Sequence, residues 1–158
     1  MTDKDFLSVS LQLAELDHLD VPALELLFQL ECSGEDFYNA LADRIGDPDA
    51  AELFRRNGRE ELGHARRIRR AIEIKLGTKY EPSDELLERL SVPVPDEIPV
   101  EMLPMIVQGE VNGDAGYQRW ADNEPDPEVA RLLRLNGREE SIHGARVSDA
   151  IAILEQPD

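Results

Sequence analysis

Two matching octapeptides constrain this chain more than any other feature of its sequence. Residues 57–64 read NGREELGH, and residues 136–143 read NGREESIH. Side chains three positions apart are neighbours on one face of an α-helix and can hold one metal ion together. The repeated pair of acid and imidazole therefore predicts two helices that carry metal ligands. These paired residues are Glu61 with His64 and Glu140 with His143.

The octapeptides belong to a longer duplication. Residues 17–74 align with residues 96–153 without a gap, at a shift of 79 residues, and 24 of the 58 aligned positions are identical. In each half, apolar residues recur at helical spacing on both sides of an Asp-Pro pair, which typically begins a helix. Each half is therefore predicted to be a helical hairpin. The expected helices cover residues 20–45, 48–76, 100–122 and 127–154.

Residues 77–99 connect the two hairpins. The segment contains Pro93, Pro95 and Pro99 and has room for one short helix, expected at residues 83–90. A connection of this length is a crossover rather than a tight turn. The predicted fold is thus all-α, a four-helix bundle built from two duplicated helical hairpins joined by a long crossover, in a single domain covering residues 1–158.

Residues 3–16 precede the duplication and carry a weaker signal. Leu7, Val9, Leu11 and Leu13 alternate as they would in a strand. No partner strand is evident elsewhere in the sequence, so we expect a short helix after an extended lead-in.

Composition limits the partners of the chain. A formal net charge of −17 disfavours nucleic acid, because phosphate binding needs an excess of Lys and Arg. Cys32 is the only cysteine, so the chain has neither an internal disulfide nor a thiolate cluster for a metal. The sequence shows no signal segment and no membrane-spanning stretch, which makes the cytoplasm the expected location and a membrane partner unexpected.

Four glutamates fall on the apolar faces of the predicted long helices. A buried carboxylate costs several kcal/mol unless it is paired or takes up a proton. Two divalent cations would balance four such charges, so the charge count predicts a binuclear metal centre. The alternative, in which the repeated residues lie in surface ion pairs, conflicts with their position in the apolar stripes. The four residues are Glu31, Glu61, Glu110 and Glu140.

These residues resemble the ligand pattern of the ferritin-like di-iron carboxylate proteins, the superfamily of rubrerythrins and bacterioferritins. The resemblance covers residues 20–154. It implies Glu31 and Glu110 as terminal ligands, one on each metal, Glu61 and Glu140 as bridging ligands, and one histidine on each ion. The implied cofactor is two iron ions per chain, with manganese or a mixed iron–manganese pair as alternatives. No haem is expected, and Met102 and Met105 are expected in the core.

The resemblance also implies residues that hold the ligands in place. Tyr38 and Tyr117 follow the terminal glutamates by seven residues, and their hydroxyls are expected to hydrogen-bond a ligand carboxylate across the bundle. Glu60 and Glu139 are expected to accept a hydrogen bond from the histidine of the opposite helix, Glu60 from His143 and Glu139 from His64.

Other repeated or clustered residues have simpler interpretations. Glycines at equivalent helical positions of both halves indicate close helix packing, or space beside the metals for a small oxidant. The arginines of the second helix are expected on a solvated face. The four glycines are Gly34, Gly58, Gly113 and Gly137, and the arginines are Arg55, Arg59, Arg66, Arg67, Arg69 and Arg70.

The resemblance implies an oxidoreductase that oxidises Fe²⁺ or reduces O₂ or H₂O₂, either a ferroxidase or a rubrerythrin-like peroxidase with an unknown electron donor. The sequence resembles a rubrerythrin without its cysteine-rich rubredoxin module. It also has Gly113 where rubrerythrins carry an additional glutamate, which weakens the peroxidase assignment. The alternative is a metal-binding or iron-handling protein without turnover. The expected assembly is a homodimer or another small homo-oligomer.

Overall fold

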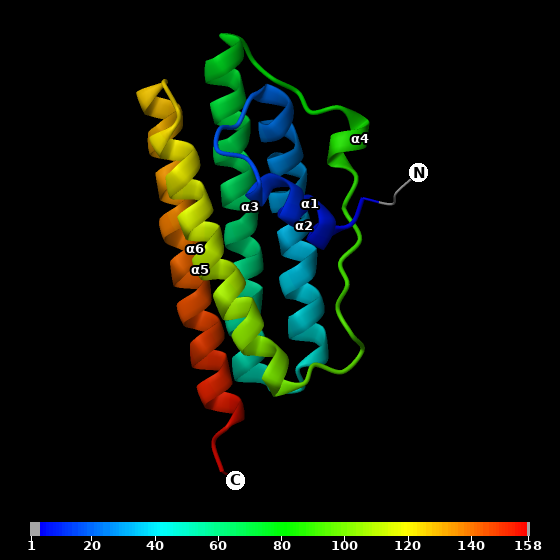
Figure 1. Cartoon of the computed structure of the whole chain (residues 1–158). Helices are drawn as coiled ribbons and strands as arrows, with labels where there is room; N and C mark the ends of the chain where they lie inside the picture. The colour runs from blue at the N-terminus through cyan, green and yellow to red at the C-terminus, as the bar shows by residue number, and fades with distance from the viewer. Residues whose placement is uncertain (1–3, 158) are drawn as a thin grey trace.

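The computed structural model describes residues 4–157, and these residues form a bundle of four long helices (Figure 1). The predicted all-α, ferritin-like architecture is confirmed. The single-domain prediction also includes residues 1–3 and 158, which lie outside the described residues. The long helices are α2 (Val21–Arg44), α3 (Pro48–Leu76), α5 (Leu103–Asp122) and α6 (Pro127–Leu154), and the shorter ones are α1 (Phe6–Ala14), α4 (Asp84–Leu87) and the 3-10 turn η1 (Val100–Met102).

Equivalent signals in the two halves begin the second helix of each hairpin. The Asp47 carboxylate accepts hydrogen bonds from the first backbone N–H groups of α3, and Asp126 does the same for α6. A proline follows each of these aspartates, and its fixed φ suits the first helical position. Gly77 ends α3 with a φ of 69°, a left-handed conformation that glycine adopts without a steric penalty.

The two hairpins meet through their second helices. Helix α2 packs along α3, α5 packs along α6, and α3 contacts α6 between them. The crossover, green in Figure 1, descends along the outer side of α2 and brings the chain to the start of α5. Among residues 4–157, no helix is long and apolar enough to cross a membrane.

Contacts with α2 make the crossover helix shorter than the sequence predicts. The Gln29 side chain donates hydrogen bonds to the carbonyl oxygens of Glu85 and Glu88, and the Leu90 N–H donates to the Ser33 hydroxyl. These carbonyl and N–H groups are satisfied by α2, so continuing the helix would gain little. Helix α4 therefore ends at Leu87, and the predicted helix over residues 83–90 is too long.

Helix α1 lies across the bundle between α2 and α5 (Figure 1). Its apolar residues form two pairs at i and i+4: Val9 and Leu13 are buried, whereas the side chains of Leu7 and Leu11 are 56% and 61% exposed. The Trp120 indole N–H donates a 2.7 Å hydrogen bond to the carbonyl of Leu16, which ties the end of this segment to α5. The alternating leucines thus mark two faces of one helix, not a strand.

The apolar core has two parts, one toward each end of the bundle. Leu24, Ile68 and Leu133 belong to one part, and Phe54 and Val147 belong to the other. The residues of the predicted metal centre lie on the same helices between them. The two methionines expected in the core differ from that prediction: Met102 is only partly buried, and Met105 is 74% exposed.

Close helix packing explains two of the repeated glycines, and it is tighter in the second half. A Cβ atom added at Gly137 would lie 2.7–2.9 Å from side-chain atoms of Gln118, Asp114 and Tyr117. At the equivalent Gly58, the nearest atoms would be 3.4 Å away, which is ordinary van der Waals contact.

The difference predicts unequal effects of the same substitution. Gly137→Ala should destabilise the protein by about 1–3 kcal/mol, because α5 and α6 would have to separate. Gly58→Ala should lie within about 1 kcal/mol of the parent protein, since the gain in helix propensity offsets the tighter contact. Urea unfolding of the two variants measures both, and equal midpoints would contradict the prediction.

Candidate metal centre

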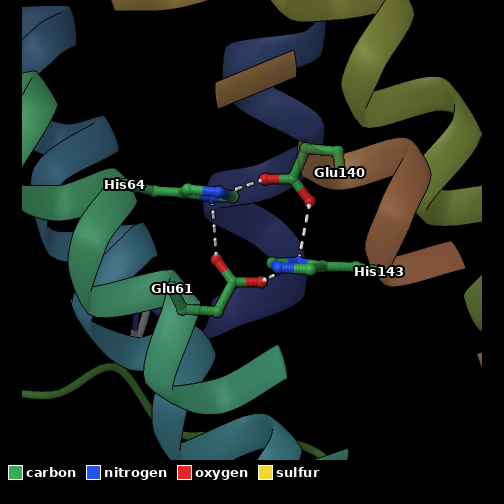
Figure 2. A group of neighbouring side chains, drawn as sticks. All are labelled: Glu61, His64, Glu140 and His143. Atoms are coloured by element: carbon green, nitrogen blue, oxygen red, sulfur yellow. Dashed lines mark ion pairs between the residues drawn. The ribbon is translucent and has the colours of Figure 1, made fainter. Parts of the chain in front are cut away.

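The six predicted ligands come together in the middle of the bundle, each from the helix expected. Donor atoms of Glu61, His64, Glu140 and His143 all lie within 4.8 Å of one another, and these four residues are buried. Figure 2 shows the two imidazoles facing the two carboxylates, with one of each coming from α3 and one from α6. The helical i, i+3 spacing in each octapeptide places acid and imidazole on the same inward face.

Each bridging candidate points one carboxylate oxygen at each imidazole. Glu61 lies 3.4 Å from Nδ1 of His64 and 3.3 Å from Nδ1 of His143. Glu140 lies 3.1 Å and 3.7 Å from the same two nitrogens. The rings are nearly parallel, with centroids 5.1 Å apart. This is the arrangement that two shared carboxylates need in order to bridge two cations held by separate imidazoles.

The remaining two glutamates approach from α2 and α5, and tyrosines hold them. Glu31 lies 3.5 Å from Nδ1 of His64 and accepts a short hydrogen bond from the Tyr117 hydroxyl of the other hairpin. Glu110, which is only half-buried, accepts a short hydrogen bond from the Tyr38 hydroxyl. Both contacts cross the bundle between hairpins, as the sequence predicts.

The outer nitrogen of each imidazole faces a glutamate of the opposite hairpin. Nε2 of His64 lies 2.9 Å from Glu139, and Nε2 of His143 lies 3.5 Å from Glu60. An acceptor at Nε2 keeps the proton there and leaves the Nδ1 lone pair free for a cation. The two expected cross-hairpin pairs are therefore present, although the second is longer than a hydrogen bond.

Two arginines hold these acceptors, and sequence reasoning missed them. Arg67 makes two hydrogen bonds to Glu139, of 2.9 and 2.8 Å. Arg146 makes one, of 2.9 Å, to Glu60. Arg67 is therefore not part of the solvated face predicted for the α3 arginines. A signal was available, because Arg67 and Arg146 are identical at equivalent positions, three residues after each histidine.

Two asparagines complete the support and were also missed as functional residues. The Asn136 side chain donates a hydrogen bond to the carbonyl of His64 and accepts one from Arg67. In the same way, Asn57 donates to the carbonyl of His143 and accepts from Arg146. Both asparagines are fully buried. Each octapeptide thus begins with the residue that fixes the other octapeptide's backbone.

The carboxylates and imidazoles shift each other's proton affinity. Burial, together with the charge of Glu61, raises the pKa of Glu31 well above its usual range, and burial together with Glu140 does the same for Glu110. Burial disfavours a charged His143, but the Glu140 and Glu61 carboxylates outweigh it and raise its pKa to about 9. In the absence of a cation, protons are thus the charges that balance the cluster.

The opposite holds for the outer acceptors. The hydrogen bond from His64 and the two from Arg67 lower the pKa of Glu139 to about 2, against the effect of its partial burial. The pKa of Glu60 is also lowered, because Arg146 outweighs the effect of partial burial. Both acceptors therefore stay ionised at neutral pH.

The residues present fit a pair of metal ions. Within residues 4–157, Nδ1 of His64 and Nδ1 of His143 are buried without a hydrogen-bond partner, which is costly unless something coordinates them. Four carboxylates surround these two nitrogens, and imidazole with carboxylate is a donor set suited to iron or manganese. At Gly34, a Cβ atom would lie only 3.0 Å from the carboxyl carbon of Glu61, so this glycine leaves the space that the carboxylate occupies.

The family model described as Rubrerythrin matches residues 23–151, a range that includes all ten predicted site residues. Searches of curated proteins and of solved structures found no match.

Proton binding by the empty cluster predicts a pH dependence of stability. Because the folded-state pKa of His143 is raised to about 9, its stabilising charge is complete below the unfolded value near 6.5 and is lost as pH rises toward 9. The raised pKa values of Glu31 and Glu110 act in the same direction. The melting temperature of chelator-treated protein should therefore fall between pH 6.5 and pH 9.

Protein loaded with a divalent metal should behave differently, because metal ligation needs neutral imidazoles and releases protons. Its melting temperature should hold across the same interval and fall on acidification below it. Calorimetry of both forms in matched buffers measures this. Parallel curves for the two forms would show that the cluster does not exchange protons for metal.

Proposed function

Because this chain belongs to the rubrerythrin family of ferritin-like di-iron carboxylate proteins, we propose that it binds two iron ions at the Glu/His cluster and couples their oxidation to the reduction of O₂ or H₂O₂. The observation that carries the proposal is the pair of buried, unpartnered Nδ1 atoms of His64 and His143 facing two shared carboxylates. A buried histidine that only fills space normally finds hydrogen-bond partners for its ring nitrogens.

Each proposed ligand has a distinct role. Glu61 and Glu140 would bridge the two ions, since each directs one oxygen toward either imidazole. Glu31 would complete the position at His64, and Glu110 the position at His143. Four carboxylates neutralise two divalent ions, which removes the cost of burying either set of charges alone.

The surrounding residues keep the ligands in a fixed protonation state. Burial and the neighbouring carboxylates raise the pKa values of Tyr38 and Tyr117, so both hydroxyls remain donors to Glu110 and Glu31. Ionised Glu139 keeps the imidazole proton of His64 at Nε2, and ionised Glu60 lies 3.5 Å from Nε2 of His143. Bound iron would supply one electron per ion, so that two ions reduce one H₂O₂, with two protons, to two molecules of water.

The second candidate is a metal-binding or iron-handling protein without turnover. It is favoured by Gly113, which stands one turn after Glu110 where rubrerythrins carry an additional glutamate. Oxidation kinetics separate the two candidates, because both predict the same metal stoichiometry.

Anaerobic titration with Fe²⁺ should give two ions per chain, and mixing with O₂ or H₂O₂ should oxidise them faster than free Fe²⁺. Glu61→Ala should lower the stoichiometry to one or fewer, because it removes a ligand shared by both ions. Glu52→Ala, an exposed substitution on the same helix, is the matched control and should leave the titration unchanged. Two bound ions without faster oxidation would favour the handling protein, and no bound metal would exclude both functions.

The unequal support of the two imidazoles predicts unequal metal positions. Arg67→Gln should weaken one of the two binding steps by about 10- to 100-fold, because Glu139 would no longer be held against His64. Arg146→Gln should have a smaller effect, since Glu60 already stands 3.5 Å from His143. Calorimetric titration with Mn²⁺ measures the two metal-binding steps separately, and Arg70→Gln, at an exposed position, is the control variant. Equal losses in both arginine variants would contradict this prediction.

A further inference from the structure

The internal repeat reveals a surface of α5 that has no cover. The equivalent helix α2 is covered along its outer side by the crossover (Figure 1), where the Gln29 amide donates hydrogen bonds to two crossover carbonyls and the Ser33 hydroxyl accepts one from Leu90. None of residues 25–36 of α2 is exposed. The corresponding residues of α5, at the shift of 79 that aligns the two halves, are 104–115, and seven of these twelve residues are exposed.

The same side chain therefore has different surroundings in the two halves. Gln29 is buried against the crossover, whereas the identical Gln108 is exposed and donates a hydrogen bond to Asn112 of its own helix. At the same shift, crossover residues 85–90 correspond to residues 6–11. Those residues form part of α1, which packs on α2. The outer side of α5 is left open as a result.

The open part of α5 carries no exposed charge. Charged residues make up 32% of the chain, yet all seven exposed residues between positions 104 and 115 are uncharged. Their helical spacing places them in one stripe along the outer side of the helix. We call this stripe the α5 face, and its residues are Pro104, Met105, Gln108, Gly109, Val111, Asn112 and Ala115.

Exposed apolar side chains gather at the α5 face. Met105 and Val111 belong to it, and Val111 is 48% exposed. Leu7 and Leu11 of α1 line a cavity together with Met105 and are also exposed. These four are more than half of the seven large hydrophobic side chains that are exposed in the described part of the chain. Such a concentration typically marks an interaction surface.

The lack of charge favours a second copy of this chain as the partner. A cationic protein would be attracted to the acidic surfaces elsewhere, whereas two copies with a net charge of −17 each repel one another least where both surfaces are uncharged. The amides of Gln108 and Asn112 contain both donor and acceptor, so they can pair with an identical face. A Cβ atom at Gly109 would meet nothing within 4 Å, which leaves room for a side chain of the second copy.

We propose that the α5 face binds the α5 face of a second copy, in a homodimer with its two-fold axis near Gln108. Met105 of one copy would then pack against Val111 of the other. The dimer requires no metal and goes beyond the proposed function. The second copy would also reduce the exposure of Glu110, which is half-buried although its counterpart Glu31 is buried.

Sedimentation velocity of the full, metal-free chain at micromolar concentration should give twice the 17.8 kDa mass of one chain. Raising NaCl from about 0.05 M to about 0.5 M should leave the dimer intact or tighten it, because screening weakens the repulsion between two acidic chains. A dimer held by ion pairs would instead dissociate as salt rises, and that result would contradict an uncharged interface.

Three substitutions of exposed apolar residues by glutamate locate the contact. Met105→Glu and Val111→Glu should each raise the dimer dissociation constant at least about tenfold, because each buries a carboxylate in an apolar contact. Leu87→Glu adds the same charge at an exposed residue of the crossover and should leave the dissociation constant unchanged. Thermal melts should show all three variants folded, since each side chain is exposed in the single chain.

Cross-linking tests the position of the axis. In a Cys32→Ser background, Gln108→Cys should form a disulfide-linked dimer under mild oxidation, because a residue beside a two-fold axis lies close to its own copy. Glu52→Cys, at an exposed position on α3, is the control and should stay monomeric on a non-reducing gel.

A parent chain that remains monomeric, or a dimer that both Met105→Glu and Val111→Glu leave intact, would overturn the proposal. A chain that dimerises without cross-linking through Gln108→Cys would also overturn it, because the contact would lie elsewhere. Binding of the monomer to neutral phosphatidylcholine vesicles, abolished by Met105→Glu, would overturn it and assign the α5 face to lipid.

Discussion

Gathering four carboxylates, three of them buried, inside an otherwise apolar bundle is the constraint on which the rest of this structure depends. Left alone, the carboxylates would repel one another, and burial raises the pKa values of Glu31 and Glu110 accordingly. The polar residues around them reduce this repulsion: two imidazoles lie between the carboxylates, two tyrosines donate hydrogen bonds to them, and an arginine–glutamate pair lies at the outer side of each imidazole. The two parts of the apolar core lie on either side of the site and exclude the water that would otherwise solvate the carboxylates.

The bundle is closely packed on the α3–α6 side and open on the α2–α5 side, and the two sides have different roles. Contacts between α3 and α6 join the hairpins where His64, His143, Glu61 and Glu140 lie, so this side fixes the geometry of the Glu/His cluster. On the other side, residues of α1, α2 and α5 line a cavity of about 670 Å³, and half-exposed Glu110 is among them. One face of the site thus positions its side chains, and the opposite face gives access to them.

Sequence could predict the fold and the convergence of the candidate ligands because duplication repeats each signal in the same helical phase. Glu31 and Glu110 stand out because both halves place an acid in an apolar stripe. Arg67 could not be recognised from composition, since a charged residue on a helix normally faces water, and only its equivalence to Arg146 marks it. Met105 was misplaced for a related reason: helical periodicity identifies residues on an apolar face, but it does not say whether protein, ligand or solvent covers that face. The length of α4 depended on side chains of α2 that no local pattern reveals.

The polar contacts of the site are reciprocal between hairpins. Asn57 donates to the carbonyl of His143, and Glu60 lies 3.5 Å from its ring. Asn136 and Glu139 hydrogen-bond His64, and each tyrosine donates to the other hairpin's glutamate. Neither hairpin alone has a satisfied polar interior, so a separated hairpin would keep these groups hydrated. When the hairpins dock, all of these polar groups must therefore lose their water in one step, as each meets its partner in the other hairpin. Folding of the two halves is consequently cooperative through polar contacts as well as through the core, and a half-docked bundle has no favourable place for its carboxylates.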